Sequence, residues 1–329
     1  MRKNQKKVVI FMPFIDVGGV EKNLFLISNY LVKNIENLSI CTTSNNYRKK
    51  FDKKISFITP KKKISEKISK RVKYFICLFL LFKFFLKDKN YLLFSFQANI
   101  YCILLCRIFK IKIIVRSNSS PTGWSHNFLK RFIYKKIISL SDEIIVNSND
   151  FKKEMDKKFN IKTNCIFNPL DKLSIDLKSK KKVTNNFFRK KYLNIINVGR
   201  LTEQKDQITI LRSVKELKDK IKIRLIIIGE GIEERNLREY IKKNHLNKQV
   251  RIYHSTTNPF KYIRSADIFV LSSKYEGLPN VLLEAAYLKK FIISSDCPTG
   301  PREILQKGQN GLLFEVGNYK DLQNKIIFY

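Results

Sequence analysis

The sequence contains no pair of cysteines at the spacing of a metal site or of a redox motif. Its six cysteines are scattered without a CxxC pair, and His126, His245 and His254 lie far from them. We therefore expect neither a zinc site nor a disulfide framework, and interpret the cysteines as buried thiols in a reducing compartment. No signal peptide is recognised before the first strand-like run, so a cytoplasmic location is expected.

A hydrophobic run long enough to span a membrane is also absent. The most apolar stretch, Tyr74 to Leu86, is interrupted by Lys83 and falls short of the roughly 20 residues that a spanning helix needs. Basic residues between Pro60 and Lys73 precede it. Two interpretations fit: a helix lying peripherally on the anionic inner face of the cytoplasmic membrane, or a buried core helix with a solvated lead-in.

Acidic residues are scarce. The 329 residues include 65 Lys and Arg but only 28 Asp and Glu, which gives a formal net charge of +37. Such a charge favours anionic partners, including phosphorylated ligands, nucleic acid or an acidic membrane. A biased composition without any single basic site explains it equally well, because lysine is abundant along the whole chain.

Strand-like and helix-like runs alternate from end to end, which is typical of parallel α/β architecture. The alternation pauses at a polar, lysine-rich stretch near residues 171–191. We therefore predict two Rossmann-like, doubly wound domains at residues 1–172 and 192–329, joined by a linker at 173–191. Ligands are expected in the cleft between the two domains, at the carboxyl ends of the strands.

Two loops that follow predicted strands are suited to binding an anion. Gly18 and Gly19 would bring backbone amides close to a ligand at a helix start, although a purely structural tight turn is the alternative. This pair is not a GxGxxG motif, so nicotinamide binding gains no support. In the second loop, Arg200 and Lys205 follow Gly199 and flank a turn, where two cations could chelate a diphosphate.

A third loop places two carboxylates, Glu276 and Glu284, eight positions apart. Gly277 permits close backbone approach, and Pro279 suits a first helical turn whose free amides favour an anion. Glu276 could accept hydrogen bonds from sugar hydroxyls, and Glu284, on the helix, from ribose hydroxyls. The alternative is an exposed acid that favours the helix dipole, followed by an unrelated acid on the helix face.

The order and spacing of five segments over residues 194–318 resemble the C-terminal half of the GT4 family of retaining, nucleotide-sugar-dependent glycosyltransferases, which have the GT-B fold. The segments are VGRLTEQK, IIGEG, ADIFVLSSKYEGLPNVLLEA, SSDCPTGPREIL and GQNGLLFEVGN. In the first domain, GGVEKNL is similar to the family's GGxE loop, and VRSNSSP to its arginine-containing segment. Glu276 and Glu284 match the family's EX7E motif.

The resemblance implies a role for each matching residue. Arg200, Lys205 and Glu276 would form the catalytic set, in which the two cations bind the donor diphosphate, and Glu284 would bind ribose. The other donor-binding positions would be Gly18, Gly19, Gly199, Gly277, Leu278, Pro279, Asn280 and Val281. On the acceptor side the resemblance suggests Arg116, together with Gln97 or Asn99, which stand where many members have a histidine; His126 lies too far along for that place.

The resemblance further implies transfer of a hexose or N-acetylhexosamine, without a metal ion, from a UDP-sugar to a saccharide or polyprenyl-linked saccharide in surface polysaccharide biosynthesis. A nucleotide-sugar epimerase of the same fold is the alternative enzyme. A basic nucleic-acid-binding protein is a further alternative, but no binding motif is recognisable, so we expect no nucleic-acid partner.

The chain ends at KDLQNKIIFY, before the helix that crosses back to the first domain in this fold, so we expect the crossing helix to be missing.

Overall fold

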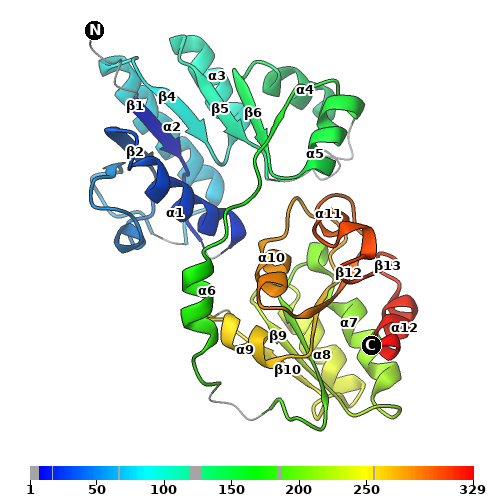
Figure 1. Ribbon diagram of the computed structural model, residues 1–329. Helices are drawn as coiled ribbons and strands as arrows, with labels where there is room; N and C mark the ends of the chain where they lie inside the picture. The colour runs from blue at the N-terminus through cyan, green and yellow to red at the C-terminus, as the bar shows by residue number, and fades with distance from the viewer. Residues whose placement is uncertain (1–6, 17, 66, 119–127, 184–186, 255) are drawn as a thin grey trace. The chain divides into compact units, whose positions relative to one another are not determined.

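The computed structural model describes residues 7–16, 18–65, 67–118, 128–183, 187–254 and 256–329. The chain divides into two compact units, Met1–Pro169 and Leu170–Tyr329 (Figure 1). Each unit contains a parallel sheet with helices on both faces. The predicted α/β architecture with two Rossmann-like units is therefore confirmed.

The sheet of the N-terminal unit has seven strands among the described residues, in the order β3-β2-β1-β4-β5-β6-β7. Its strands are β1 (Lys7–Phe11), β2 (Asn37–Cys41), β3 (Ser56–Ile58), β4 (Leu92–Ser95), β5 (Ile113–Arg116), β6 (Glu143–Val146) and β7 (Asn164–Cys165). Its helical segments are α1 (Gly19–Leu31), η1 (Arg48–Lys50), α2 (Lys70–Lys87), α3 (Asn99–Phe109), α4 (Phe128–Ile138), α5 (Asn149–Lys153) and η3 (Glu154–Lys158). The order reverses between β1 and β4, which is where doubly wound sheets bind ligands.

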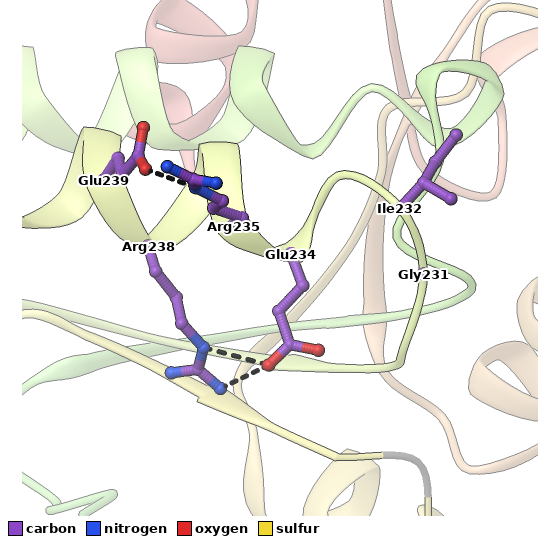
Figure 2. A pocket seen from close by; sticks show the side chains of 6 residues that line it. All are labelled: Gly231, Ile232, Glu234, Arg235, Arg238 and Glu239. Carbon is purple, nitrogen blue, oxygen red and sulfur yellow. Dashed lines mark hydrogen bonds and ion pairs between the residues drawn. The ribbon is translucent and has the colours of Figure 1, made fainter.

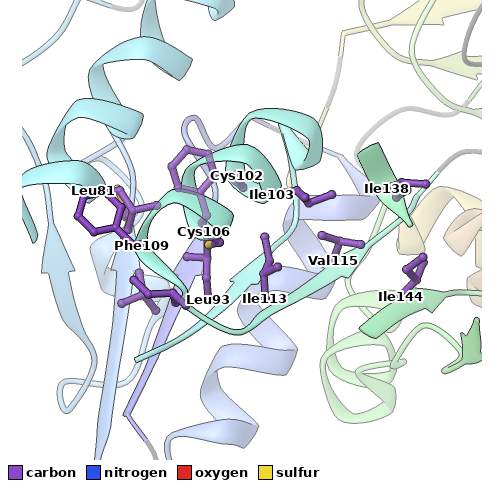
Figure 3. Close-up of a cluster of buried hydrophobic side chains, with 14 of the residues drawn as sticks. Leu81, Leu93, Cys102, Ile103, Cys106, Phe109, Ile113, Val115, Ile138 and Ile144 are labelled. Atoms are coloured by element: carbon purple, nitrogen blue, oxygen red, sulfur yellow. The ribbon is translucent and has the colours of Figure 1, made fainter. Parts of the chain in front are cut away.

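The apolar strands of this sheet are buried on both faces, as the interior of a parallel sheet requires. Along β1, Val9 and Phe11 pack with α2, α3 and α5, whereas Val8 and Ile10 pack on the opposite face with α1. Figure 3 shows Leu81 of α2 among the side chains that α3 and α4 bury over the strands. Helices α2, α3, α4 and α5 therefore cover this face.

The sheet of the C-terminal unit has six strands among the described residues, in the order β10-β9-β8-β11-β12-β13. Its strands are β8 (Leu193–Val198), β9 (Ile223–Ile228), β10 (Val250–Tyr253), β11 (Ile268–Leu271), β12 (Phe291–Ser295) and β13 (Leu312–Phe314). Its helical segments are α6 (Lys172–Ser179), η4 (Glu203–Lys205), α7 (Gln207–Leu217), α8 (Glu234–Lys243), α9 (Phe260–Ser265), α10 (Asn280–Tyr287), α11 (Pro301–Ile304), η5 (Gln306–Gly308) and α12 (Tyr319–Phe328). One face packs against α7, α8 and α12, and the other against α6, α9, α10 and α11.

The division between the units lies after Pro169, three residues before the predicted end of the first domain. Most of α6 falls inside the predicted linker, yet the helix is part of the C-terminal unit. Ile175 is buried there, and Asn258 Nδ2 donates a hydrogen bond to the Lys178 carbonyl at 2.9 Å. The lysine-rich sequence conceals this helix because one apolar side chain of α6, Ile175, is buried while Leu173 and Leu177 are exposed.

The cysteines match the expectation of buried thiols without disulfide bonds. The six cysteines are unpaired, and all are buried except Cys165, which is half-buried.

The basic segment that precedes the apolar helix lies largely outside it. Helix α2 begins only at Lys70, and the Ser69 hydroxyl accepts a hydrogen bond from the Val72 amide at this helix start. Within the described residues, no helix is both long and apolar enough to cross a membrane.

Candidate functional site

In the C-terminal unit, the predicted site residues lie on loops that leave the carboxyl ends of β8 and β11. Gly199, Arg200 and Lys205 follow β8, and Glu276 follows β11. These strands are neighbours in the sheet, so their loops emerge side by side, as expected for parallel strands.

Lys205 and Glu276 form a largely buried ion pair. The Lys205 ammonium donates to Glu276 Oε1, and the Ser273 hydroxyl donates to the same oxygen at 2.6 Å. The two charged side chains are only 15% and 8% exposed. Ser273 is itself held by the Ser295 hydroxyl, which donates to its carbonyl at 2.7 Å. The predicted phosphate-binding cation and the predicted sugar-binding acid are thus direct neighbours.

Further hydrogen bonds fix the two loops against each other. The Ser272 hydroxyl donates to the Lys205 carbonyl, and the Lys274 amide donates to the Gln204 carbonyl, both at 2.8 Å. The Gln204 side chain in turn donates to the Tyr275 carbonyl at 2.8 Å. Because these hydrogen bonds involve backbone atoms of both loops, the position of the Lys205 side chain does not depend on the ion pair alone.

The loop after β12 supports the Glu276 loop from behind. The Thr299 hydroxyl donates to the Glu276 carbonyl. Gly300 adopts a left-handed conformation with φ of +84°, and a Cβ built on it would lie 2.4 Å from the Gly277 carbonyl oxygen. Burial, together with the Glu276 carboxylate, raises the pKa of the Cys297 thiol to about 12, so this neighbour is an uncharged thiol at neutral pH.

The loop after β9 braces the loop after β8. The Leu201 amide donates to the Glu230 carbonyl at 2.9 Å, and the Glu233 amide donates to the Leu201 carbonyl at 3.0 Å. A Cβ on Gly229 would lie 1.9 Å from the Gly199 carbonyl oxygen, so only glycine fits there. We infer that the IIGEG segment holds the start of the cationic loop in place.

A shallow hollow beside this brace carries none of the predicted site residues (Figure 2). Its lining residues are Gly231, Ile232, Glu234, Arg235, Arg238 and Glu239. Its arginines pair along α8, with Arg238 on Glu234 and Arg235 on Glu239, each at 2.8 Å. The cations of the hollow are therefore engaged within their own helix.

Arg200 contrasts with these arginines. Its side chain is exposed and makes no hydrogen bond or ion pair with any residue that the structure describes. Its carbonyl accepts a hydrogen bond from the Gln207 side chain at 3.0 Å, which fixes the backbone. Arg200 is therefore a cation on a fixed loop, available to an anionic ligand.

The predicted helix after Glu276 is present as α10, which begins at Asn280 with Pro279 as its N-cap residue. The other predicted donor-binding residues lie at this helix start: Gly277, Leu278, Asn280 and Val281. Glu284 lies one turn into α10 and is only 3% exposed. Because Glu276 and Glu284 are both buried, the alternative of a solvent-exposed acid at the helix start is wrong.

In the N-terminal unit, Gly18 is the N-cap residue of α1, and Gly19 is the first helical residue. A Cβ on Gly18 would lie 2.6 Å from Glu21 Oε2, so a side chain there would displace the buried Glu21 carboxylate. The absence of a side chain leaves the amide end of α1 accessible to a ligand.

The predicted acceptor-side residues lie at the ends of β4 and β5. Asn99 is held in place, because its side chain accepts from the Ser95 hydroxyl at 2.8 Å and donates to the Arg116 carbonyl at 3.1 Å. Arg116 is 1% exposed, and burial lowers its pKa to about 10, which leaves it charged at neutral pH. Its Nη2 donates to Asn168 at 2.7 Å. His126 lies outside the described residues.

Arg116 Nε and Gln97 Oε1 are among the buried polar atoms at this edge that have no hydrogen-bond partner in the described residues. Unsatisfied buried polar atoms are rare and often mark ligand positions. Both residues were predicted through the family resemblance. No pattern in the sequence predicted Ser272, Ser273, Ser295 and Thr299, whose hydroxyls are recognisable as site components only once the loops are seen together.

Comparison with known proteins gives a consistent picture. Residues 178–329 match the family model described as Glycosyl transferases group 1. An uncharacterised glycosyltransferase of Methanocaldococcus jannaschii is 38% identical over 228 residues, which cover 62% of this chain and 53% of that protein. The N-acetylgalactosamine-N,N'-diacetylbacillosaminyl-diphospho-undecaprenol 4-alpha-N-acetylgalactosaminyltransferase of Campylobacter jejuni is 28% identical over 228 residues, which cover 66% and 60%.

The fold is also found among solved structures. The crystal structure of Anabaena HepE in complex with UDP and glucose matches with a TM-score of 0.78 at 15% identity, covering 98% of this chain and 89% of that one. This likeness confirms the predicted GT-B fold. The chain spans little more than half the length of the curated relatives, 53% and 60% of the two above.

Replacing Gly300 with alanine tests the support from the β12 loop. The variant places a Cβ against the Gly277 carbonyl in a left-handed backbone conformation. Gly317→Ala is the matched control, because φ is +76° there and nothing lies within 4 Å of the added Cβ. Both variants incur the backbone strain, but overpacking should cost Gly300→Ala a further 1–3 kcal/mol or so in the free energy of unfolding. Denaturant titrations measure both, and equal losses would contradict the tight packing of the two loops.

Proposed function

We propose that the chain, whose residues 178–329 match the family model of the group 1 glycosyl transferases, is a retaining glycosyltransferase of the GT4 type. Its donor is a UDP-linked hexose or N-acetylhexosamine, and its acceptor is a saccharide or a polyprenyl-linked saccharide in surface polysaccharide biosynthesis. The observation that carries the proposal is the Lys205–Glu276 pair, fixed at the carboxyl end of the sheet next to the exposed cation Arg200.

The two cations would bind the donor diphosphate. An ammonium group has three hydrogen-bond donors, and the described contacts of the Lys205 ammonium use one of them on Glu276. The remaining donors, together with the Arg200 guanidinium, can neutralise the charge that develops on the leaving diphosphate. Because the loop is braced by neighbouring backbone, little reorganisation is needed when this charge appears.

Glu276 would hold the sugar. Both described contacts of its carboxylate go to Oε1, so Oε2 can accept a hydrogen bond from a sugar hydroxyl. Glu284 would accept from the ribose hydroxyls. The amides at the start of α10 provide further donors for the phosphates or the sugar. Transfer then needs neither a resident metal ion nor a protein nucleophile: the acceptor hydroxyl attacks the face from which the diphosphate leaves, and a phosphate oxygen takes the proton.

Two relatives support the kinds of substrate. Anabaena HepE is described in complex with UDP and glucose, and the Campylobacter relative is named for transfer to a diphospho-undecaprenol-linked saccharide. In the N-terminal unit, Arg116 and Gln97 would contribute to acceptor binding. A polyprenyl-linked acceptor is anchored in lipid, so we propose that the protein works in peripheral contact with the inner face of the cytoplasmic membrane.

Arg200→Gln tests the diphosphate role without disturbing a buried pair. Loss of one charge-stabilising donor should lower kcat about a hundredfold or more, which corresponds to roughly 3 kcal/mol in the barrier. The matched control is Arg212→Gln on α7, where the arginine is also exposed. Initial rates of UDP release with and without acceptor give the comparison. Turnover near that of the wild type in the Arg200 variant would refute the assignment. Equal UDP release without acceptor would indicate a hydrolase, and conversion of the donor to another UDP-sugar without UDP release would indicate an epimerase.

Glu284→Gln tests the ribose role. The amide keeps the size of the buried side chain but loses the charge, and hydrogen bonds to charged groups contribute about 1.5–3 kcal/mol. The affinity for UDP in calorimetry should therefore fall by roughly ten- to a hundredfold. Glu216→Gln on the exposed side of α7 should bind UDP like the wild type. Unchanged UDP affinity in a folded Glu284→Gln protein would contradict contact with ribose.

A further inference from the structure

The helix α2 carries two apolar stripes, of which the structure buries only one. Cys77, Leu81 and Phe85 are fully buried against the sheet. A second stripe recurs at helical spacing on the exposed side: Val72, Phe75, Phe79, Phe82 and Leu86. Phe75 and Phe79 are 62% and 57% exposed. The core interpretation from sequence therefore holds for the first stripe, whereas the second stripe remains uncovered in the described chain.

The exposed stripe continues onto α3, where Tyr101, Leu104 and Ile108 follow the same helical spacing. The Phe75 and Tyr101 rings lie 6.1 Å apart, centroid to centroid, so the two stripes meet. On α4, which packs against α3, Leu129 and Phe132 are also exposed. We call this surface of α2, α3 and α4 the apolar face. Contiguous apolar surfaces of this kind mark interaction sites.

Within the described residues of α2, α3 and α4, the apolar face is accompanied by positive charge only. The sequences of α2, α3 and α4 contain no aspartate or glutamate. Lysines stand beside the aromatic rings, with Lys83 Nζ 4.4 Å from the Phe79 centroid and Lys136 Nζ 5.6 Å from the Phe132 centroid. Acids near the ends of these helices are paired: Asp88 with Lys7 at 2.7 Å, Asp142 with Arg107 at 3.1 Å, and Asp16 with Lys70 at 3.0 Å.

We propose that the apolar face docks onto an anionic phospholipid bilayer, with Phe75, Phe79 and Phe82 entering the acyl region and the adjoining lysines contacting headgroup phosphates. Exposed aromatic and aliphatic side chains flanked by cations suit the interface of such a bilayer. A second copy of the chain is a poor occupant, because it would bring two purely cationic faces together. Nucleic acid would use the lysines but leave the apolar stripe in water. The inference deepens the proposed membrane contact and rests on that part of the proposed function.

Vesicle co-sedimentation of the full chain tests the proposal. Vesicles of phosphatidylcholine with about one third phosphatidylglycerol should retain the protein, and pure phosphatidylcholine should not, because the surface charge drives the encounter. Phe75→Ser/Phe79→Ser should weaken binding to the anionic vesicles at least tenfold. Leu173→Ser/Leu177→Ser is the matched control, since these α6 residues are at least as exposed and should have no effect. Lys73→Glu/Lys83→Glu should also lose binding, whereas Lys242→Glu/Lys243→Glu on α8 should retain it.

Insertion of the apolar face into the bilayer is measured with a separate variant, so that misfolding of the Phe75→Ser/Phe79→Ser protein cannot determine the result. Trp124 is the only tryptophan in the chain, so Phe79→Trp in a Trp124→Phe background reports from the apolar face alone. Its emission should shift to the blue on anionic vesicles and be quenched by brominated acyl chains. Absence of wild-type binding, binding unaffected by Phe75→Ser/Phe79→Ser, or an unquenched tryptophan would each overturn the proposal. UDP binding measured on the same samples distinguishes this failure from failure of the proposed transferase, because Arg200, Lys205 and Glu284, which we propose to bind the nucleotide, lie in the other unit.

Discussion

The buried ion pair between Lys205 and Glu276 is the contact on which the site of the C-terminal unit depends. Removing either partner would destabilise the unliganded site, because burying an unpaired ion costs several kcal/mol. Together they join the loop after β8 to the loop after β11, and serine hydroxyls and backbone amides hold the two loops in register. A nucleotide-sugar would meet a cation and an acid whose positions are set before it arrives.

The surrounding loops contribute little chemistry themselves but fix the position of the Lys205–Glu276 pair. The β12 loop approaches so closely that only Gly300 fits against the Gly277 carbonyl, and the β9 loop does the same through Gly229. Four neighbouring strands thus supply one rigid constellation. Preorganisation of this kind is what allows fixed charges to stabilise a transition state, since no loop has to move as charge develops.

The alternation of apolar runs was sufficient to predict two parallel α/β units, because buried parallel strands are apolar on both faces. It could not reveal α6, whose single buried apolar residue, Ile175, gives no periodic signal among exposed lysines and leucines. In the site, the sequence predicted that Arg200, Lys205 and Glu276 lie on loops at strand ends and that Glu284 lies on the following helix, and the structure places them there. The direct pairing of Lys205 with Glu276 was not predictable, because contacts between loops 71 positions apart depend on strand order.

The cations behind the net charge of +37 fall into two groups that only the structure distinguishes. Many cations are scattered or paired, as on α8, whereas those of α2, α3 and α4 accompany an uncovered apolar surface. A general compositional bias supplies lysines everywhere, but it does not explain an exposed stripe of phenylalanine and leucine at helical spacing. The same lysine-rich composition is therefore solvated surface on α8 and, in our proposal, part of a docking face in the N-terminal unit.

The most direct test of the account is the effect of Glu276→Gln on the affinity for UDP and for a UDP-sugar, measured by calorimetry on the same sample. If Glu276 holds the sugar while Lys205 holds the diphosphate, the substitution should weaken UDP-sugar binding at least tenfold while leaving UDP binding unchanged or tighter, because Lys205 gains freedom to reach the phosphates. Equal losses for the two ligands, or no nucleotide binding by the wild-type chain, would contradict the division of roles within the ion pair.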